Sequence, residues 1–437
     1  MADTKPIAVA REGRIIDAPQ GWQTRYTVGL MCMGATFVCF IDRVNISVAL
    51  IPMAEEFDWD YKTQSFVLSS FYIGYLLMQI AGGRLADRFG GALVLGIGVL
   101  VWSLFTIVTP WAAALGIYVL VLARIGMGLG ESVSFPSIYS LVTRWFPNSE
   151  RSKAIALNAS GVSLGTVFAL LVTPLIVVQL GWQWAFYLFG IVGIVWYIAW
   201  RLLVTTTPQE HPSITAHELE YISAHAPSTG AAEEPPPWGK LLTNMPMWAI
   251  IVAHFTNNWT LYVILSWLPI YVNKGLGVDF ASVGMISMLP HLTSLVFLNV
   301  VGNYADRLVS KGLNITRVRK TMQTIAFGGL AACLLMLPVV DSVWAAIGFM
   351  CLGKVFASLN IGGHVVNHMD IAPKHAGSLM GISNTAGTIP GIVAVFVTGY
   401  ILDSTGSWDL VWQITAGVTL AGGLFYLIFA SGEQQFD

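Results

Sequence analysis

The sequence predicts an all-α polytopic membrane protein of twelve transmembrane helices, built as two six-helix repeats. Hydrophobic residues make up 55% of the 437-residue chain and charged residues only 11%, with a mean hydropathy of +0.68. An average soluble chain carries roughly 25% charged residues. The apolar residues also fall into blocks of about twenty, the helix length that crosses a hydrocarbon core ~30 Å thick. With a net charge of −2 there is no basic excess. These features exclude a disordered chain, a nucleic-acid binder and an ordinary soluble enzyme.

Twelve such blocks can be marked along the chain. The first is too long for the core of a signal peptide and no small-residue cleavage site follows it, so we expect a retained helix. All four cysteines lie inside blocks without a C-x-x-C pair, which indicates buried reduced thiols. The predicted spans are 27–50, 64–82, 92–110, 113–140, 152–178, 183–203, 246–271, 282–301, 318–339, 342–367, 376–400 and 409–431.

The distribution of basic residues predicts the orientation of these helices. Twelve crossings place both termini on one side of the membrane, and 17 of the 22 Lys and Arg residues fall on that side. Only Lys62 and Lys274 fall in the opposite loops. Cytoplasmic loops carry an excess of Lys and Arg, so both termini are expected in the cytoplasm.

The chain also shows an internal duplication. Gly83–Arg88 (GRLADR) follows the second span, and Gly302–Arg307 (GNYADR) follows the eighth, half a chain length later. Two parallel six-helix repeats around a midplane cavity are a known transporter architecture. The predicted organisation is a cytoplasmic tail (1–26), an N-terminal six-helix half (27–203), a polar, partly helical linker (204–243), a C-terminal half (244–432) and a short cytoplasmic end (433–437).

Five charged residues lie well inside the predicted helices, away from their ends: Asp42, Arg43, Arg124, Glu131 and Lys354. Each central Asp, Lys or Arg costs ~2.5–3.5 kcal/mol on insertion scales, so these side chains must face a wet cavity or one another. Arginine stays charged and presents a planar fork to a carboxylate. Glutamate can gain or lose a proton as its surroundings change. Fixed cations beside a titratable acid are the chemistry of an anion site with a proton switch, although a salt-bridge cluster that only holds helices together remains an alternative.

The spacing of these charged residues predicts which of them share a helix face. Arg124 and Glu131 are seven residues apart, which is two turns or ~10.5 Å along one face. Asp42 and Arg43 are adjacent, so their side chains diverge by ~100° and one can face the cavity while the other faces a neighbouring helix. His364 and His368 have i, i+4 spacing but no evident third ligand, so we expect no metal site.

Several motifs in order resemble those of the anion:cation symporter family of the major facilitator superfamily, over about residues 22–434. Within it they resemble the branch of vesicular glutamate transporters, sialin, plant plastid anion transporters and bacterial sugar-acid permeases. The resemblance rests on Phe40–Asn45, Gly83–Arg88, Gly130–Pro136, Trp145–Pro147, His211–Ile214, Asn367–Pro373 and Gly381–Asn384. The chain departs from the pattern at Leu68, where animal vesicular members carry histidine, and at Val162, where galactonate-type permeases carry glutamine. Lys354 and His364 match nothing in the pattern.

The resemblance implies a role for each candidate residue. In the resembled fold, helices one, four, seven and ten line the cavity. Residues matching Arg43 and Arg124 recognise the substrate carboxylate or gate its access, those matching Asp42 and Glu131 couple transport to protons, and Tyr75 and Asn384 match substrate-bonding positions. Lys354, outside the pattern, is a further candidate substrate contact or the partner of a buried group. The loop motifs imply gate elements, in which the acid contacts a helix N-terminus in the outward-facing state: Gly83, Asp87, Arg88, Asp306 and Arg307.

The resulting expectation is a secondary active transporter, not an enzyme, that carries a small organic anion by alternating access with proton symport. It requires no cofactor, and H⁺ is the expected coupling ion. Its partners are the anion and the lipid bilayer, with no nucleic acid, and we expect a monomer in a bacterial inner membrane. The alternatives are a sodium-linked, exchange or uniport carrier of an anion or phosphate, and a membrane sensor that has lost transport.

Overall fold

The computed structural model describes residues 17, 19–225 and 238–435, without the side chains of 238, 242, 298–310, 374 and 377. Eleven spans in this part of the chain are long and apolar enough to cross a membrane. The twelfth crossing is α10, which is 26 residues long and carries His254, Asn257 and Asn258 in its middle. The described chain therefore has the predicted twelve-helix organisation.

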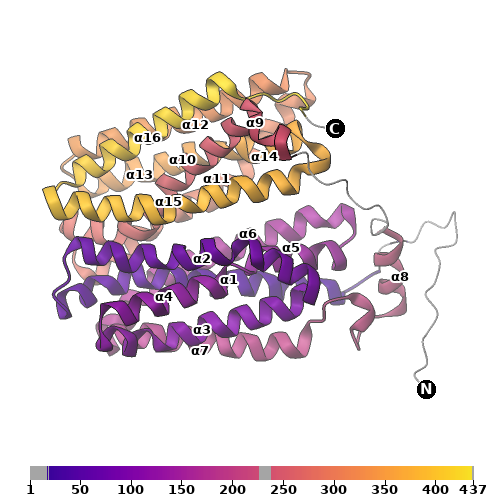
Figure 1. The fold of residues 1–437 in the computed structure, drawn as a ribbon, viewed down its shortest axis with the longest axis horizontal. Coiled ribbons are helices and arrows are strands. Elements are labelled where there is room, and N and C mark those ends of the chain that lie inside the picture. Colours follow the sequence, from indigo (N-terminus) through magenta and orange to yellow (C-terminus); the bar gives the residue numbers. More distant parts are fainter. Residues whose placement is uncertain (1–16, 18, 226–237, 436–437) are drawn as a thin grey trace.

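The helices form two layers, one from each half of the sequence (Figure 1). The first layer contains α1 (Thr24–Glu56), α2 (Tyr61–Phe89), α3 (Gly91–Leu115), α4 (Ile117–Glu131), α5 (Ser134–Trp145), α6 (Asn148–Leu180) and α7 (Trp182–Leu203). Along the chain, the short η1 (Pro208–Glu210), α8 (Ala216–His225) and α9 (Trp238–Thr243) connect the two halves. The second layer contains α10 (Met245–Ile270), η2 (Tyr271–Gly275), α11 (Phe280–Ser310), α12 (Ile315–Met336), η3 (Leu337–Val339), α13 (Val343–Ser358), η4 (Leu359–Gly362), α14 (His364–Ile371), η5 (Pro373–His375), α15 (Ala376–Thr405) and α16 (Trp408–Phe429).

Two of the predicted spans are broken helices. The fourth span divides into α4 and α5 around Ser132 and Val133, because Pro136 has no N–H to donate to the Ser132 carbonyl. The tenth span divides at Gly363, where the Gln323 side chain accepts a hydrogen bond from the His364 amide at 3.0 Å. The third span also runs five residues past its predicted end, to Leu115, because the chain turns only at Gly116 with φ of +128°.

Small residues allow close helix packing between α1 and α6. A Cβ atom at Gly161 or Gly165 would collide with the backbone carbonyls of Met33 and Phe37. This close approach is the role that small-xxx-small motifs have in membrane helices, where no hydrophobic force drives helices together.

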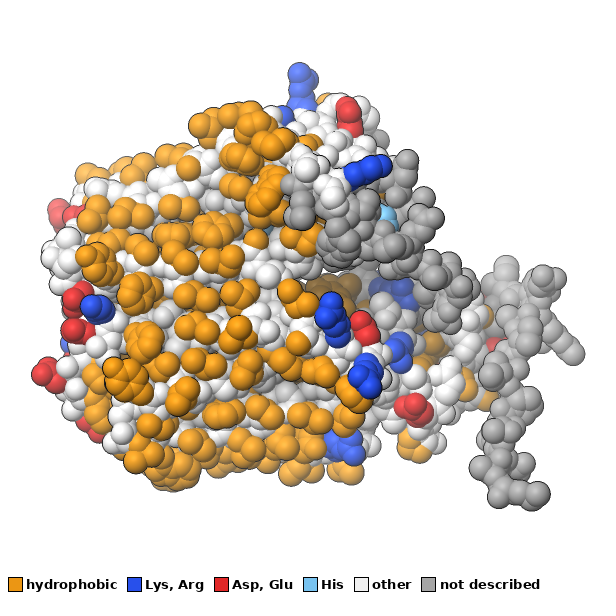
Figure 2. All heavy atoms as spheres, in the orientation of Figure 1, with side chains coloured by type: hydrophobic (Ala, Val, Ile, Leu, Met, Phe, Trp, Pro, Cys, Tyr) orange, Lys and Arg blue, Asp and Glu red, His pale blue; other side chains and the backbone are white. Residues whose placement is uncertain are grey.

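Side-chain type varies from one end of the molecule to the other (Figure 2). Hydrophobic side chains cover the middle of the visible face, and Lys and Arg side chains gather at the end that carries α8. We call this the basic end. At the other end Asp60 begins α2 by accepting a hydrogen bond from the Thr63 amide at 2.7 Å. Hydrogen bonds from Thr63 hold the pKa of Asp60 below its ordinary value.

At the basic end α8 is held to the first layer by a buried ionic network. Glu218 accepts hydrogen bonds from the Thr24 and Arg25 amides, both at 3.0 Å, and from the Arg25 guanidinium at 3.2 Å. Arg25, which is fully buried, also pairs with Glu150 at 2.8 Å. One carboxylate thus supplies partners to the free amides at the start of α1 and neutralises a buried cation.

Candidate functional site

A buried ion pair joins α1 to the end of α4. The Arg43 guanidinium donates to a single oxygen of Glu131, Oε2, from Nε at 2.9 Å and from Nη2 at 2.8 Å. The Cys39 thiol donates to the same oxygen at 3.2 Å. The other oxygen, Oε1, is buried and has no hydrogen-bond partner among the described residues. One carboxylate oxygen therefore holds the cation while the other is open to a proton.

Arg124, on α4, supplies a second buried cation with no acidic partner in the described chain. Its Nη1 donates to the Met127 sulfur at 2.9 Å, and its Nε makes no hydrogen bond with any described residue. The Phe71 ring is close to both guanidinium groups, with its centroid 5.0 Å from Arg43 Cζ and 5.3 Å from Arg124 Cζ. Cation–π attraction to this ring stabilises both cations. Arg124 thus keeps hydrogen-bonding capacity for an anion.

Both arginines line a central cavity between the two layers. Its wall comes mainly from α1, α2 and α4, and α10 contributes Leu265 and Ser266. The cavity volume is only about 10 Å³, about the space of one water molecule. A carboxylate cargo does not fit there unless the layers move apart.

Asp42 points away from this cavity. Its Oδ2 accepts a hydrogen bond from the Trp102 indole on α3 at 3.1 Å, and Asp42 is fully buried. Arg43, its neighbour, lines the cavity, so the two side chains diverge as their spacing on α1 requires. The structure therefore brings Arg43, Arg124 and Glu131 together at the cavity and places Asp42 behind them.

Two further candidate substrate contacts lie on α2 and α15. Tyr75 is buried beside Arg43, with its ring centroid 5.0 Å from Cζ. Asn384 is half-buried on α15, one turn before Thr388, which donates to Gln79 of α2 at 3.1 Å.

Lys354 occupies α13 in the second layer and is 8% exposed. Gly353 faces Leu330 and Cys333 of α12, so Lys354, about 100° further round, points away from α12. Its charge acts on His291 of α11, and its ammonium group makes no hydrogen bond or ion pair with the described side chains. Lys354 does not line the central cavity.

The loop motifs lie at the basic end. Asp87 is exposed and makes no hydrogen bond or ion pair with the described residues, and Arg88 stacks on Phe89 at 5.2 Å. Gly83 faces Pro136 of α5. The contact of an acid with a helix N-terminus, expected for the outward-facing state, is thus not formed by Asp87 with the described residues. The side chains of Asp306 and Arg307 lie outside the described ones, and their backbone belongs to α11.

In the second layer the polar side chains are mostly neutral. Ser383 lies between two histidines, with its Oγ 2.7 Å from His368 Nε2 and 3.2 Å from His254 Nδ1. The His254 and His364 rings are 5.7 Å apart. His364 Nδ1 lies 3.1 Å from Gln323 Oε1, so this histidine, which matched no family pattern, is held inside a side-chain network.

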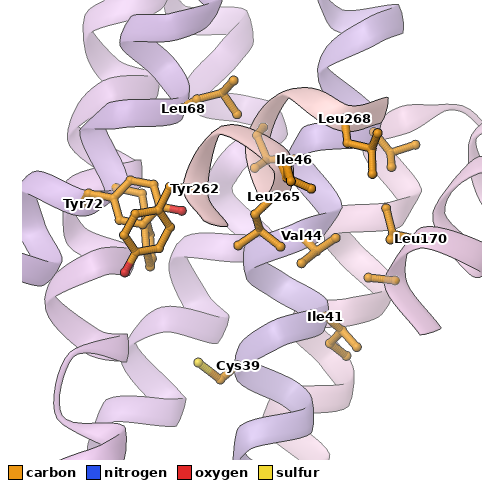
Figure 3. Packing of buried hydrophobic residues seen from close by; sticks show 14 of the residues in the cluster. Cys39, Ile41, Val44, Ile46, Leu68, Tyr72, Leu170, Tyr262, Leu265 and Leu268 are labelled. Atoms are coloured by element: carbon orange, nitrogen blue, oxygen red, sulfur yellow. The ribbon is translucent and has the colours of Figure 1, made fainter. Parts of the chain in front are cut away.

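The layers meet at the end opposite the basic end. Glu55 and Lys274 form an ion pair between α1 and η2. Tyr72 and Tyr262 pack with ring centroids 4.6 Å apart, with Leu265 in the same buried cluster (Figure 3). Gly391 of α15 lies directly against the Tyr72 ring. These contacts close the central cavity from this end.

Comparison with known proteins identifies the class that this fold defines. The model of the Major Facilitator Superfamily matches residues 32–395, so the chain belongs to that superfamily. A bacterial homologue of the human lysosomal transporter Spinster, in an inward-facing and occupied conformation, superimposes with a TM-score of 0.74 over 94% of this chain and 97% of its own, at 15% identity. At that identity the likeness concerns the fold alone.

More similar relatives are chloroplastic transporters and sialin, as the resemblance implied. The chain is 40% identical to an Arabidopsis thaliana chloroplastic ascorbate transporter, over 100% of this chain and 81% of that protein. It is 40% identical to the Arabidopsis thaliana chloroplastic sodium-dependent phosphate transport protein 1, over 94% and 80%. It is 34% identical to human sialin, over 96% and 91%. The chain is therefore a transporter of the anion-carrying part of the superfamily, and not an enzyme.

Sequence reasoning did not single out several residues that shape this site. Phe71, Cys39, Met127 and Trp102 each contact at least one of the intramembrane charges, but all are apolar or weakly polar residues within apolar blocks. Cys39 alone had a signal, because it stands one turn before Arg43 on α1.

Proposed function

We propose that this protein imports a small organic anion, such as a carboxylate or sugar acid, together with protons, by alternating access. The observation that carries the proposal is that Glu131 holds the Arg43 guanidinium at the wall of a cavity that Arg124 also lines. Two arginines at one cavity fit a carboxylate, which accepts bidentate hydrogen bonds from a guanidinium. The anion-carrying relatives support the class of cargo.

The geometry supports a specific coupling step. A proton added to Oε1 of Glu131 makes the carboxyl neutral and weakens the two hydrogen bonds that Oε2 accepts from Arg43. The Arg43 guanidinium then turns to the cargo carboxylate. When the cargo leaves, Arg43 returns to Glu131 and the proton is released. Protonation and anion binding thus favour each other, which is the requirement for symport.

The basic end would face the cytoplasm, since Lys and Arg are in excess in cytoplasmic loops. The contacts that close the other end would then lie on the outer side of the membrane. We propose a monomer, because both arginines and Glu131 come from one chain. We propose a bacterial inner membrane on the resemblance to bacterial sugar-acid permeases.

A test uses purified protein in proteoliposomes, with a pH gradient, a sodium gradient or neither, and labelled carboxylates as cargo. Wild type should accumulate cargo only with the pH gradient. Glu131→Gln should still exchange cargo across the membrane but should lose accumulation, because no group at that position registers the gradient. Accumulation by Glu131→Gln equal to wild type would move the coupling role elsewhere, with Asp42→Asn as the next variant.

A second candidate is a sodium-linked or exchange carrier of phosphate. It is favoured by the 40% identity to the chloroplastic sodium-dependent phosphate transport protein 1. In the same liposomes, phosphate uptake driven by sodium and unaffected by the pH gradient would support this candidate over proton symport.

A further inference from the structure

A surface groove separates α12 from α16 at the basic end, far from the central cavity. Its volume is about 500 Å³, and its lining includes Arg317 and Lys320 but no Asp or Glu among the described residues. Arg317 is exposed, and its guanidinium makes no hydrogen bond or ion pair in the described structure. Lys320 donates to the Ile428 carbonyl of α16 at 3.3 Å, which ties the cation to both walls. The groove is thus a positively charged recess between two membrane helices.

The groove follows a single face of α12. Arg317, Lys320, Thr321, Thr324 and Ile325 have i, i+3, i+4, i+7 and i+8 spacing, which places them on one stripe of the helix. Along this stripe the side chains change from basic to hydroxyl to apolar. The total rise is ~12 Å, and the two basic residues occupy its first ~4.5 Å.

This order of chemistry matches the depth profile of a lipid leaflet. The polar headgroup layer on each side of the hydrocarbon core is roughly 5–7 Å thick. Arg317 and Lys320 therefore reach the phosphate level, and Thr321 and Thr324 the level of the ester groups. Below them Ile325 and Leu427, 45% and 42% exposed, form an apolar surface for an acyl chain.

The two threonine hydroxyls are available to a ligand. A threonine inside a helix commonly donates to the carbonyl four residues earlier, as Thr415 and Thr419 do on α16. Thr321 and Thr324 make no hydrogen bond with any described residue. A general excess of cytoplasmic Lys and Arg explains the cations, but not a recess that also holds two unused hydroxyls and an apolar floor.

We infer that this groove binds one anionic phospholipid, with its phosphate on Arg317 and Lys320, its ester oxygens on the threonines and an acyl chain along Ile325 and Leu427. Basic recesses between membrane helices are suited to anionic headgroups. The site is separate from the transport cavity, so it does not depend on the cargo or on the coupling ion.

The test is native mass spectrometry of the full chain, with phosphatidylglycerol or phosphatidylcholine of the same acyl chains added to the detergent-solubilised protein. Wild type should retain one phosphatidylglycerol in preference to phosphatidylcholine. Arg317→Gln/Lys320→Gln should bind phosphatidylglycerol about thirtyfold more weakly, and Thr324→Val should weaken it less. The matched control is Arg201→Gln. Arg201 is an exposed cation on α7 at the basic end of the molecule, and it lies outside the groove.

Three results would overturn the inference. The first is equal retention of the two lipids by wild type, and the second is the same loss in Arg201→Gln as in the double variant. The third is displacement of phosphatidylglycerol by inorganic phosphate, with a rise in melting temperature equal to the rise that phosphatidylglycerol produces. That result would make the groove a site for soluble anions. If the double variant does not fold, Arg317→Gln alone carries the test, because that guanidinium makes no contact that the fold needs.

Discussion

The two halves of this transporter face the same cavity with different chemistry. The first half presents two buried arginines and a glutamate, with Asp42 behind them on Trp102. Among the described residues, the second half contributes the uncharged Leu265 and Ser266 to the cavity wall. Its charged side chains Lys354, Arg319 and Asp370 do not line the cavity. The duplication therefore conserved the helix arrangement without conserving the charges.

This difference separates recognition from closure. In the proposed mechanism, charge in the first half would attract an anion and respond to a proton, while the second half supplies Tyr262 and Leu265 to cover it. A neutral partner can move away from a charged surface without breaking a buried ion pair. Movement between the halves is therefore less costly than it would be if charges faced each other across the cavity.

Substitution of Arg124, the cation of the first half without an acidic partner among the described residues, should have the largest effect on anion binding. Arg124→Ala should weaken anion binding by ~2–5 kcal/mol, which is roughly thirtyfold or more, because a buried anion loses its charged partner. Arg124→Lys should recover little, since lysine lacks the planar fork. Isothermal titration with the anion that most raises the melting temperature measures both. Asn257→Ala in the second half is the control and should bind within a few-fold of wild type; equal losses in both variants would contradict the division.

The halves should also differ in how much stability one polar contact provides. Arg43→Met leaves the Glu131 carboxylate buried without its cation, which should cost about 3–5 kcal/mol. Asn258→Leu removes a 2.8 Å hydrogen bond to the Gly387 carbonyl and should cost about 1–3 kcal/mol. Melting temperatures in one detergent rank the variants. Arg43→Met/Glu131→Gln should regain most of the loss, and a double variant no better than Arg43→Met would show that the ion pair is not its cause.

Lys354 could contradict this division, because it is a charged residue of the second half. If it contacts the cargo when the halves separate, Lys354→Met should lose affinity for dianions more than for monoanions, by ~1–3 kcal/mol. If it is only a structural neighbour of His291, the melting temperature should fall and the ranking of anions should stay the same. Both quantities measured in one preparation decide the question, with Cys351→Ala, three residues earlier on the same helix, as the control.

Much of the fold follows from the sequence, because helix length and apolarity are fixed by the bilayer. The predicted block 152–178 lies within α6 and the block 183–203 within α7. The breaks near Ser132 and at Gly363 were not predicted, since each depends on a local backbone partner, Pro136 in one case and the distant Gln323 in the other. Hydropathy averaged over a helix does not change when one backbone hydrogen bond is lost, so it does not predict these breaks.

The candidate site was predictable to the extent that charge is rare in a membrane. Arg43, Arg124 and Glu131 stand out in apolar blocks, and the structure places them together. The sequence did not indicate that Arg43 pairs with Glu131 while Arg124 has only Met127 and Phe71, because that choice depends on how α1, α2 and α4 are rotated. Lys354 was equally conspicuous in sequence yet lies outside the cavity in this conformation.

The docking of α8 has a mechanical consequence. Because Glu218 fixes α8 to the start of α1, the connection between the halves is the segment from His225 to Trp238 and not the whole polar stretch. When the halves tilt against each other, the first layer and α8 would therefore move as one rigid body.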